Sequence, residues 1–212
     1  MKILLTGFEP FGGSDVNPSE QVVRMLSGRP LRGVRLATAI LPVDQETGPA
    51  ALLRAVEEVQ PEAVVCLGEA AGRAAVSIER VATNLLDYRI ADNAGRQVVD
   101  QPIVAGGTAA YFSTLPVRDL MAAIQEAGIP VELSLSAGAF LCNQVMYVLL
   151  HHLHERRLDL PAGFIHLPAL PEQAARRSPP IASMSLESMC QAVSIAVRVL
   201  ATKGRDSPSG QA

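Results

Sequence analysis

Short apolar runs alternate along the chain with longer segments in which apolar residues recur at helical spacing. The short runs are typical of strands that are buried on both faces, and they span residues 3–6, 34–41, 63–67, 131–135 and 163–166. The longer segments predict helices over residues 19–26, 48–59, 116–127, 142–156 and 185–202. This alternation predicts an α/β domain in which helices cover both faces of a sheet.

The segment 74–86 has a different pattern, because its side chains alternate between the two sides of an additional predicted strand. Residues 87–107 are rich in Asp, Asn and Gly, which indicates a long ordered surface loop of the kind that often carries function. No break in composition divides the chain. We therefore expect a single domain over residues 1–203 and a flexible tail over residues 204–212.

Composition and charge restrict the classes of partner. With 212 residues, of which 49% are hydrophobic, the chain is long enough to bury one core. A net charge of -3 with scattered Lys and Arg gives no basic patch for nucleic acid or for an anionic membrane. The N-terminal apolar run is too short for a signal peptide, and no stretch is long enough to span a membrane. A cytoplasmic protein is expected.

The three cysteines, Cys66, Cys142 and Cys190, are widely spaced and lack C-x-x-C pairing. This pattern argues against a disulfide framework and against a structural zinc site. We therefore expect free thiols, including that of Cys190.

Cys142 lies where an extended segment turns into a predicted helix. The first turn of a helix has unpaired N–H groups and the positive end of the helix dipole, which favour the reactive thiolate. Cys142 is therefore a candidate nucleophile. The alternative is a cysteine that only fills space, because cysteine is among the residue types that are most often buried.

A cysteine nucleophile needs a base that takes its proton, and histidine has a suitable pKa. His151, His152 and His154 are poor candidates, because they lie about 13 Å or more along the axis of the helix that Cys142 begins. His166 ends a predicted strand, and the crevice of an α/β sheet lies at the carboxyl ends of its strands. The alternative role for His166 is a hydrogen bond to a neighbouring loop.

Glu79 is the candidate for the group that fixes the imidazole tautomer. It lies on the predicted additional strand between apolar neighbours, where an unpaired carboxylate is costly. A purely structural salt bridge with a nearby arginine, such as Arg80 or Arg89, is the competing account.

Aromatic residues are scarce, since the chain has five Phe and no Trp, yet three Phe lie near the candidate site. Phe8 and Phe11 follow the first predicted strand, and Phe140 precedes Cys142 by two residues. These rings are candidates for an apolar pocket, or else they fill the core beneath a loop. The first loop lacks the glycine spacing of a phosphate site. Residues 176–180, with the sequence RRSPP, are expected to be a solvated connector.

Several blocks of sequence, in order along the chain, carry a resemblance to a known family. They are GFEPFGG at 7–13 with NPS at 17–19, GRxxxSIERVATN at 72–84, DYRIADNxG at 87–95, SAGAFLCN at 136–143 and GFIHLP at 163–168. Together they resemble the pyroglutamyl peptidase I family, whose members are cysteine peptidases that remove an N-terminal pyroglutamate. The resemblance implies a three-layer α/β/α sandwich with a mixed, largely parallel central sheet. It also implies a homotetramer that requires no metal or cofactor.

The resemblance places a catalytic triad, motif by motif, on Glu79, Cys142 and His166. It implies that Cys142 attacks the pyroglutamyl carbonyl, that His166 passes the proton to the departing amine, and that water cleaves the thioester. It further implies that Arg89 stabilises the negative charge that develops on the substrate. The expected partners are peptides with an N-terminal pyroglutamate.

Pyroglutamate is a compact and uncharged ring, so it suits an apolar pocket. The expected pocket residues are Phe8, Phe11, Phe140 and Leu141.

Two positions depart from the bacterial pattern of the family. Glu69 stands where glutamine is usual; it can accept a hydrogen bond from the lactam N–H but cannot donate one when it is ionised. Tyr88 stands where alanine is common and is expected to narrow or reshape the cleft. Because of Glu69, the alternative function is a protein of the same fold that binds lactams or peptides without turnover or with altered specificity.

Overall fold

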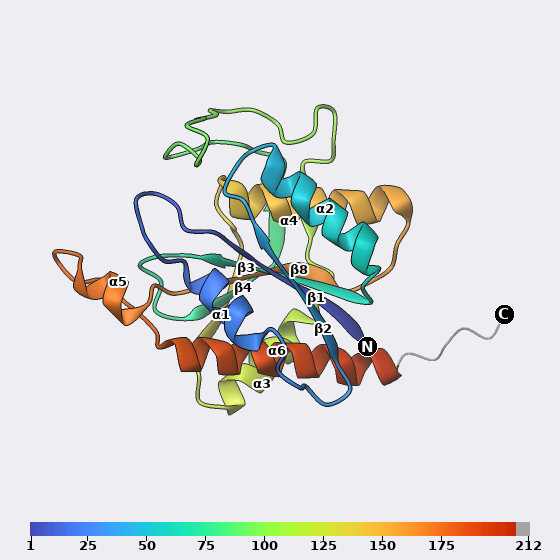
Figure 1. The fold of residues 1–212 in the computed structure, drawn as a ribbon. Coiled ribbons are helices and arrows are strands. Elements are labelled where there is room, and N and C mark those ends of the chain that lie inside the picture. Colours follow the sequence, from blue (N-terminus) through green and yellow to red (C-terminus); the bar gives the residue numbers. More distant parts are fainter. Residues whose placement is uncertain (207–212) are drawn as a thin grey trace.

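The structure is a computed structural model that describes residues 1–206, and a mixed sheet forms its middle layer (Figure 1). The strands of the sheet are β1 (Lys2–Phe8), β2 (Arg35–Leu41), β3 (Ala63–Glu69), β4 (Val76–Glu79), β7 (Val131–Ser134) and β8 (Ala162–Leu167). They lie in the order β2-β1-β3-β8-β4-β7. All neighbours are parallel except β4 and β8, so the sheet is mixed and largely parallel, as the resemblance implies.

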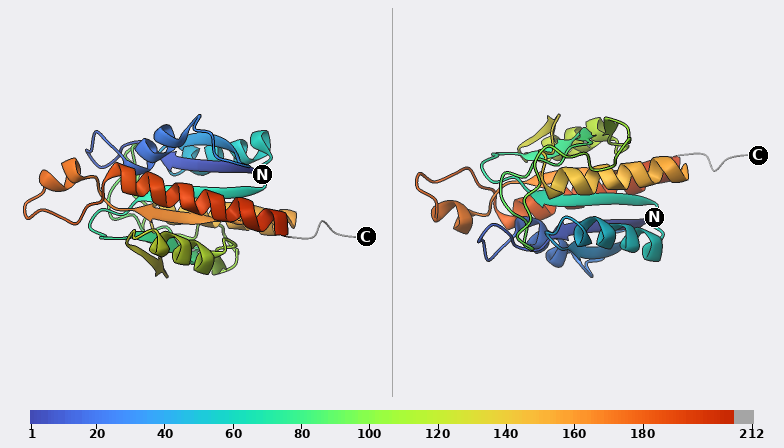
Figure 2. Two further views of the ribbon diagram at one scale, coloured as in Figure 1. Left: turned by 90° about the horizontal axis from the view of Figure 1, so that it is seen from below. Right: turned by 90° about the horizontal axis from the view of Figure 1, so that it is seen from above.

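Helices pack on both faces of this sheet, which confirms the expected three-layer sandwich (Figures 1 and 2). One face carries α2 (Thr47–Val59) and α4 (Leu141–Arg156), and the other carries α1 (Pro18–Leu26), α3 (Val117–Glu126) and α6 (Leu186–Asp206). The short α5 (Pro171–Ala175) and its following loop extend beyond one end of the layers (Figure 2). Within residues 1–206, none of the helices combines the length and apolar character that crossing a membrane needs.

Alternation along two central strands decides which side chains face α4. On β4, Val76 and Ile78 enter the core beneath α1, α3 and α6, so the alternate residue Glu79 faces the opposite side. On β8, Phe164 lies in the core under α4, and His166 shares its face. The antiparallel register aligns Ser77 with His166, so Glu79 and His166 lie diagonally on one face.

The segment 74–86 does not form the single strand that its alternation predicts. It divides at Arg80 into β4 and β5 (Val81–Thr83), and β5 pairs with β6 (Ala110–Phe112) in a separate antiparallel sheet. The Arg80 N–H donates to Ser134 O at 2.8 Å, and the Arg80 carbonyl accepts from the Ser113 N–H at 2.9 Å. The backbone of Arg80 thus changes partners between the two sheets, and an uninterrupted alternation cannot reveal such a change.

The predicted loop over residues 87–107 is ordered by its own hydrogen bonds. Leu86 and Gln101 form a short bridge, and the Tyr88 N–H donates to Val98 O at 2.7 Å. Asp92 is buried, and its side chain accepts from the N–H groups of Ala94 and Arg96.

The helix α6 continues to Asp206, three residues past the predicted end of the domain at residue 203. The apolar periodicity stops before the helix does, and the first proline after it is Pro208. The remainder of the predicted flexible tail, residues 207–212, lies outside the described residues.

Candidate active site

A buried carboxylate, an imidazole and a guanidinium meet on the face of the sheet beneath α4. Glu79 ends β4, His166 lies next to the end of the antiparallel strand β8, and Arg73 comes from the loop before β4. Glu79 Oε1 lies 2.7 Å from His166 Nδ1 and also 2.7 Å from Arg73 Nη1. Arg73 is further held by a hydrogen bond from Nη2 to Ser136 O at 3.1 Å. Glu79 therefore does both things that the sequence left open: the same carboxylate oxygen contacts the histidine and forms a salt bridge with an arginine. That arginine is Arg73, which precedes Glu79, and not Arg80 or Arg89.

Glu79 is ionised in this environment although it is fully buried. Burial raises the pKa of the carboxyl, but the hydrogen bond and charge of His166, together with Arg73, outweigh burial and hold the pKa below its ordinary value. Glu79 Oε2 has no hydrogen-bond partner among residues 1–206, because the Ser134 hydroxyl donates to Ser136 O instead. An ionised carboxylate only accepts hydrogen bonds, so His166 must carry its proton on Nδ1.

His166 is neutral at neutral pH in the free protein. Burial lowers its pKa, and Arg73 lowers it further, against the opposing effects of the hydrogen bond and charge of Glu79. With Nδ1 occupied as a donor to Glu79, Nε2 is left as a free acceptor. His166 is therefore in the protonation state that a general base needs.

Cys142 is the second residue of α4 and lines the same pocket as His166. Buried Asn143 holds the start of this helix in place: its side chain accepts from the Thr83 N–H and donates to the carbonyls of Thr83 and Leu85. The sulfur lies over Gly68, where a β-carbon would come within 2.8 Å of Sγ. Only a glycine at this point of β3 leaves room for the thiol.

The expected thiolate is not favoured in the free protein. Burial, followed by the charges of Glu79 and Glu69, raises the pKa of Cys142 to about 12. These effects outweigh the favourable position at the helix start. No hydrogen bond joins Cys142 and His166 within residues 1–206, so the thiol is neutral and must lose its proton as it attacks.

A pocket of about 190 Å³ lies in front of Cys142 and His166. Its apolar walls include Phe11 and Phe140, whose ring centroids are 5.9 Å apart, and Ile90. Glu69 and Arg89 also line it. A small apolar ring with a few polar contacts is the kind of ligand that such a pocket suits.

Phe8 and Leu141 do not line this pocket, contrary to expectation. Both are buried in the core beneath α2 and α4, and Phe8 packs against Phe164 with ring centroids 6.4 Å apart. Strand alternation explains Phe8, because it is the last residue of β1 and points toward these helices. Leu141 points away from the cleft because it precedes Cys142 in a helix, where adjacent side chains diverge.

Tyr88 does not narrow the cleft directly. Its side chain is buried, and its hydroxyl donates to Gln144 Oε1 at 2.6 Å. Its ring meets Phe140 edge to face, with centroids 4.6 Å apart. Tyr88 thus supports Phe140 from behind.

Glu69 ends β3 and is held by Gln173, whose Nε2 donates to Glu69 Oε1 at 3.0 Å. Burial raises the pKa of Glu69, although the Gln173 hydrogen bond and the charge of Arg177 act in the opposite direction. Gln173 is fixed in turn, because its Oε1 accepts from the Leu170 N–H at 2.8 Å.

Sequence reasoning missed several residues of the site. Arg73 precedes Glu79 in the sequence, and the signal that points to it is that a buried carboxylate requires a cation on either side. Gly68, Ile90 and Gln173 carry no chemical signature by themselves. Residues 176–180 are exposed, as expected for a solvated connector, and the first two of them also line a chamber that adjoins the pocket.

The residues 1–206 contain no group of three His, Cys, Asp or Glu side chains placed to hold a metal ion.

Comparison with known proteins gives a consistent result over nearly the whole chain. The family model described as pyroglutamyl peptidase matches residues 1–203. The chain is 52% identical to a pyrrolidone-carboxylate peptidase of Vibrio vulnificus over 188 residues, which cover 89% of this chain and 87% of that protein. It is 50% identical to a pyrrolidone-carboxylate peptidase of Gloeobacter violaceus over 200 residues, which cover 94% of this chain and 97% of that protein.

Comparison with solved structures finds proteins of the same family. A mutant pyrrolidone carboxyl peptidase from the hyperthermophile Pyrococcus furiosus is similar with a TM-score of 0.93 and 41% identity, covering 96% of this chain and 99% of that chain. The pyroglutamyl peptidase I from Bacillus amyloliquefaciens is similar with a TM-score of 0.91 and 38% identity, covering 94% of both chains.

Proposed function

The chain belongs to the pyroglutamyl peptidase family of hydrolases, and we propose that it removes an N-terminal pyroglutamate from peptides with Cys142 as nucleophile, His166 as general base and Glu79 as the group that orients His166. The observation that carries these roles is the 2.7 Å contact between His166 and a buried, ionised Glu79, beside a pocket that Cys142 also lines.

Attack begins with two neutral groups. As Cys142 Sγ bonds to the pyroglutamyl carbonyl carbon, its proton passes to His166 Nε2. The resulting imidazolium is stabilised by Glu79, which lies at 2.7 Å and already carries the negative charge. Arg73 keeps Glu79 ionised and holds it in this orientation.

Negative charge on the carbonyl oxygen needs donors in place before the reaction. The first N–H groups of α4 have no partners within the helix and lie beside the nucleophile. Arg89 lines the same pocket, which supports its role as a second source of positive charge.

Collapse of the tetrahedral intermediate breaks the C–N bond, and His166 gives its proton to the leaving amine. Water, deprotonated by His166, then cleaves the thioester and returns the thiol.

Recognition of the ring rests on Phe11, Phe140 and Ile90 for its methylenes and on Glu69 for its lactam N–H. Gln173 occupies Glu69 Oε1, so Oε2 is the oxygen that accepts from the lactam.

The exchange Glu69→Gln tests this role and separates the leading function from the alternative of binding without turnover. We expect the wild type to release arylamine from pyroglutamyl arylamide but not from the prolyl or glutamyl arylamides. Glu69→Gln should retain this preference, with kcat/KM changed by less than about tenfold, because an amide oxygen can also accept from Gln173 and from the lactam. If the wild type were inactive and only Glu69→Gln turned over, the alternative would be correct.

Thermal unfolding gives a second measurement on Glu69, namely the effect of its raised pKa on stability. Its pKa is raised in the folded protein, so the folded state binds this proton more tightly than the unfolded state does. The associated stability is present at low pH and is lost as pH rises through the raised pKa. Glu69→Gln should therefore raise Tm more at neutral pH than near pH 4.5, the ordinary pKa of the carboxyl.

Gly68→Ala should damage catalysis without removing any catalytic group. The added methyl would lie 2.7 Å from Phe164 Cζ and 2.8 Å from Cys142 Sγ, so the thiol must shift. We expect kcat/KM for pyroglutamyl arylamide to fall by about tenfold to a hundredfold, because small displacements of a nucleophile are costly. Overpacking should also destabilise the fold by about 1–3 kcal/mol.

Gly163→Ala is the matched control for Gly68→Ala. It lies on the neighbouring strand, and its added methyl would contact Ser113 and Leu115 instead of the thiol. It should lower Tm while kcat/KM of the folded protein stays near the wild-type value. Equal losses of kcat/KM in the two variants would show that general destabilisation, not displacement of Cys142, is responsible.

We also infer a cytoplasmic homotetramer. This assembly rests on the family resemblance and is supported by exposed apolar side chains, namely Phe112 on β6 and Leu135 after β7.

A further inference from the structure

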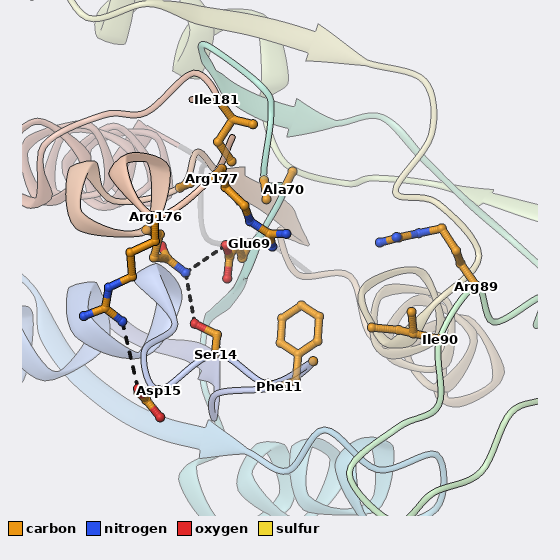
Figure 3. Close-up of a pocket in the computed structure, with 15 residues that line it drawn as sticks. Phe11, Ser14, Asp15, Glu69, Ala70, Arg89, Ile90, Arg176, Arg177 and Ile181 are labelled. Carbon is orange, nitrogen blue, oxygen red and sulfur yellow. Dashed lines mark hydrogen bonds and ion pairs between the residues drawn. The ribbon is translucent and has the colours of Figure 1, made fainter. Parts of the chain in front are cut away.

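A second chamber, of about 660 Å³, adjoins the pocket that holds Cys142 and His166. The two cavities share a wall that includes Phe11, Glu69 and Arg89. The outer chamber is otherwise bounded by the loop after β1 and by the loop after α5, which brings Arg176 and Arg177 to it (Figure 3). Segments far apart in the sequence thus enclose one cleft with an inner and an outer part.

The charges of the outer chamber are unbalanced. It is lined by Arg89, Arg176 and Arg177 and by the carboxylates Asp15 and Glu69. Arg176 turns toward Asp15, with Nη1 at 4.0 Å from Oδ2, so these two charges offset each other. Arg89 and Arg177 form no ion pair with any residue in the described part of the chain, and in Figure 3 they point toward one another across the chamber.

Arg177 is an exposed residue that lines the outer chamber. Its backbone N–H donates to Ala174 O at 3.1 Å, so the turn after α5 sets its position. Its charge acts on Glu69, but Glu69 Oε1 accepts its hydrogen bond from Gln173. Since the Arg177 guanidinium forms no ion pair within residues 1–206, it is available to a ligand in the outer chamber.

We propose that the outer chamber binds the leaving peptide and that Arg177, opposite Arg89, selects substrates with a carboxylate close behind the pyroglutamyl group. This inference rests on the proposed peptidase function. With the ring in the inner pocket, the chain beyond the scissile bond continues into the adjoining chamber. A guanidinium binds a carboxylate through paired N–H donors. The carboxylate is either an acidic side chain at the first or second position of the leaving peptide or the C-terminus of a short peptide.

Matched substrates separate these two sources. Pyroglutamyl-glutamate amide against pyroglutamyl-glutamine amide isolates the side-chain carboxylate. Pyroglutamyl-alanine against its amide isolates the C-terminal carboxylate. We expect the wild type to favour the acidic member of at least one pair by about threefold in kcat/KM, the size expected for a solvent-accessible ion pair. Salt at about 0.5 M should reduce this preference, because it screens exposed charges.

The variants Arg177→Gln and Arg118→Gln assign the preference to one side chain. Arg118 is an exposed arginine on α3, outside both cavities, so its substitution removes the same net charge without touching the cleft. Arg177→Gln should abolish the acidic preference, and Arg118→Gln should retain it. Pyroglutamyl arylamide, whose leaving group has no carboxylate, reports the basal reaction of each variant.

Two results would overturn the proposal. One is equal kcat/KM for the acidic and neutral members of both pairs in a wild type that cleaves the arylamide, which would leave the peptidase function intact. The other is an acidic preference that survives Arg177→Gln. Failure to cleave the arylamide at all would refute the proposed function, and this subsite with it.

Discussion

Cys142→Ala should abolish release of arylamine from pyroglutamyl arylamide, with kcat/KM reduced on the order of 10⁴-fold or more. The reason is that no other described side chain can form the acyl-enzyme: Cys142 alone among the three cysteines lines the pocket with His166. The fold should persist, since the change removes one sulfur that bears no hydrogen bond to His166. Steady-state kinetics and thermal unfolding measure the two effects separately.

Cys190→Ala is the matched control, because Cys190 is a free thiol buried on α6, on the other side of the sheet. The Cys190→Ala variant should retain activity.

Iodoacetamide should inactivate the wild type by labelling Cys142, at a rate that keeps rising between about pH 7 and about pH 9, because the free thiol is neutral. Full activity in Cys142→Ala would refute the assignment of the nucleophile.

Glu79→Gln should lower kcat/KM by about a thousandfold, because the imidazolium then forms without its anionic partner. The substitution also leaves Arg73 as an uncompensated cation beside His166. The amide oxygen of the variant can still accept from His166 Nδ1, but the charge of Glu79 is lost, so burial and Arg73, which both lower the pKa of His166, are opposed less. The acidic limb of the kcat/KM profile, which reports His166 in the free enzyme, should therefore move to lower pH while the plateau falls.

Glu132→Gln provides the comparison for Glu79→Gln. Glu132 is exposed on β7, the strand next to β4, and accepts a hydrogen bond from Ser77 at 2.7 Å. It lies outside the pocket, so kcat/KM and its pH dependence should be unchanged. If Glu79→Gln lowered the plateau but left the acidic limb in place, Glu79 would have a structural role only.

Acid should destabilise the protein through the same pair. Glu79 and His166 both have lowered pKa values in the folded state, so the unfolded state binds their protons more tightly. The stability from Glu79 is present above pH 4.5, its ordinary value, and is lost as pH falls through its lowered pKa. Buried neutral His166 adds a loss that begins as pH falls below 6.5.

The apolar pattern predicted the layers of helices and strands well, because a strand that is buried on both faces consists of a continuous run of apolar residues. The runs at 63–67 and 163–166 became the central strands β3 and β8 with only small extensions. The pattern failed at Arg80, where a continuous alternation passes from one sheet to another. Alternation records which side chains share a face, but not which strand is the neighbour.

The sequence by itself determined the family, the fold class and the identities of Glu79, Cys142 and His166 as candidates. Residue type, strand alternation and the start of a helix are local properties, and they suffice for these conclusions. Only the tertiary structure decided that Arg73 is the cation at Glu79, that the Cys142 thiol is neutral, and that Arg177 faces the cleft. Glu79 and His166 are 87 residues apart, and the balance between burial and charge at such a contact depends on packing in three dimensions.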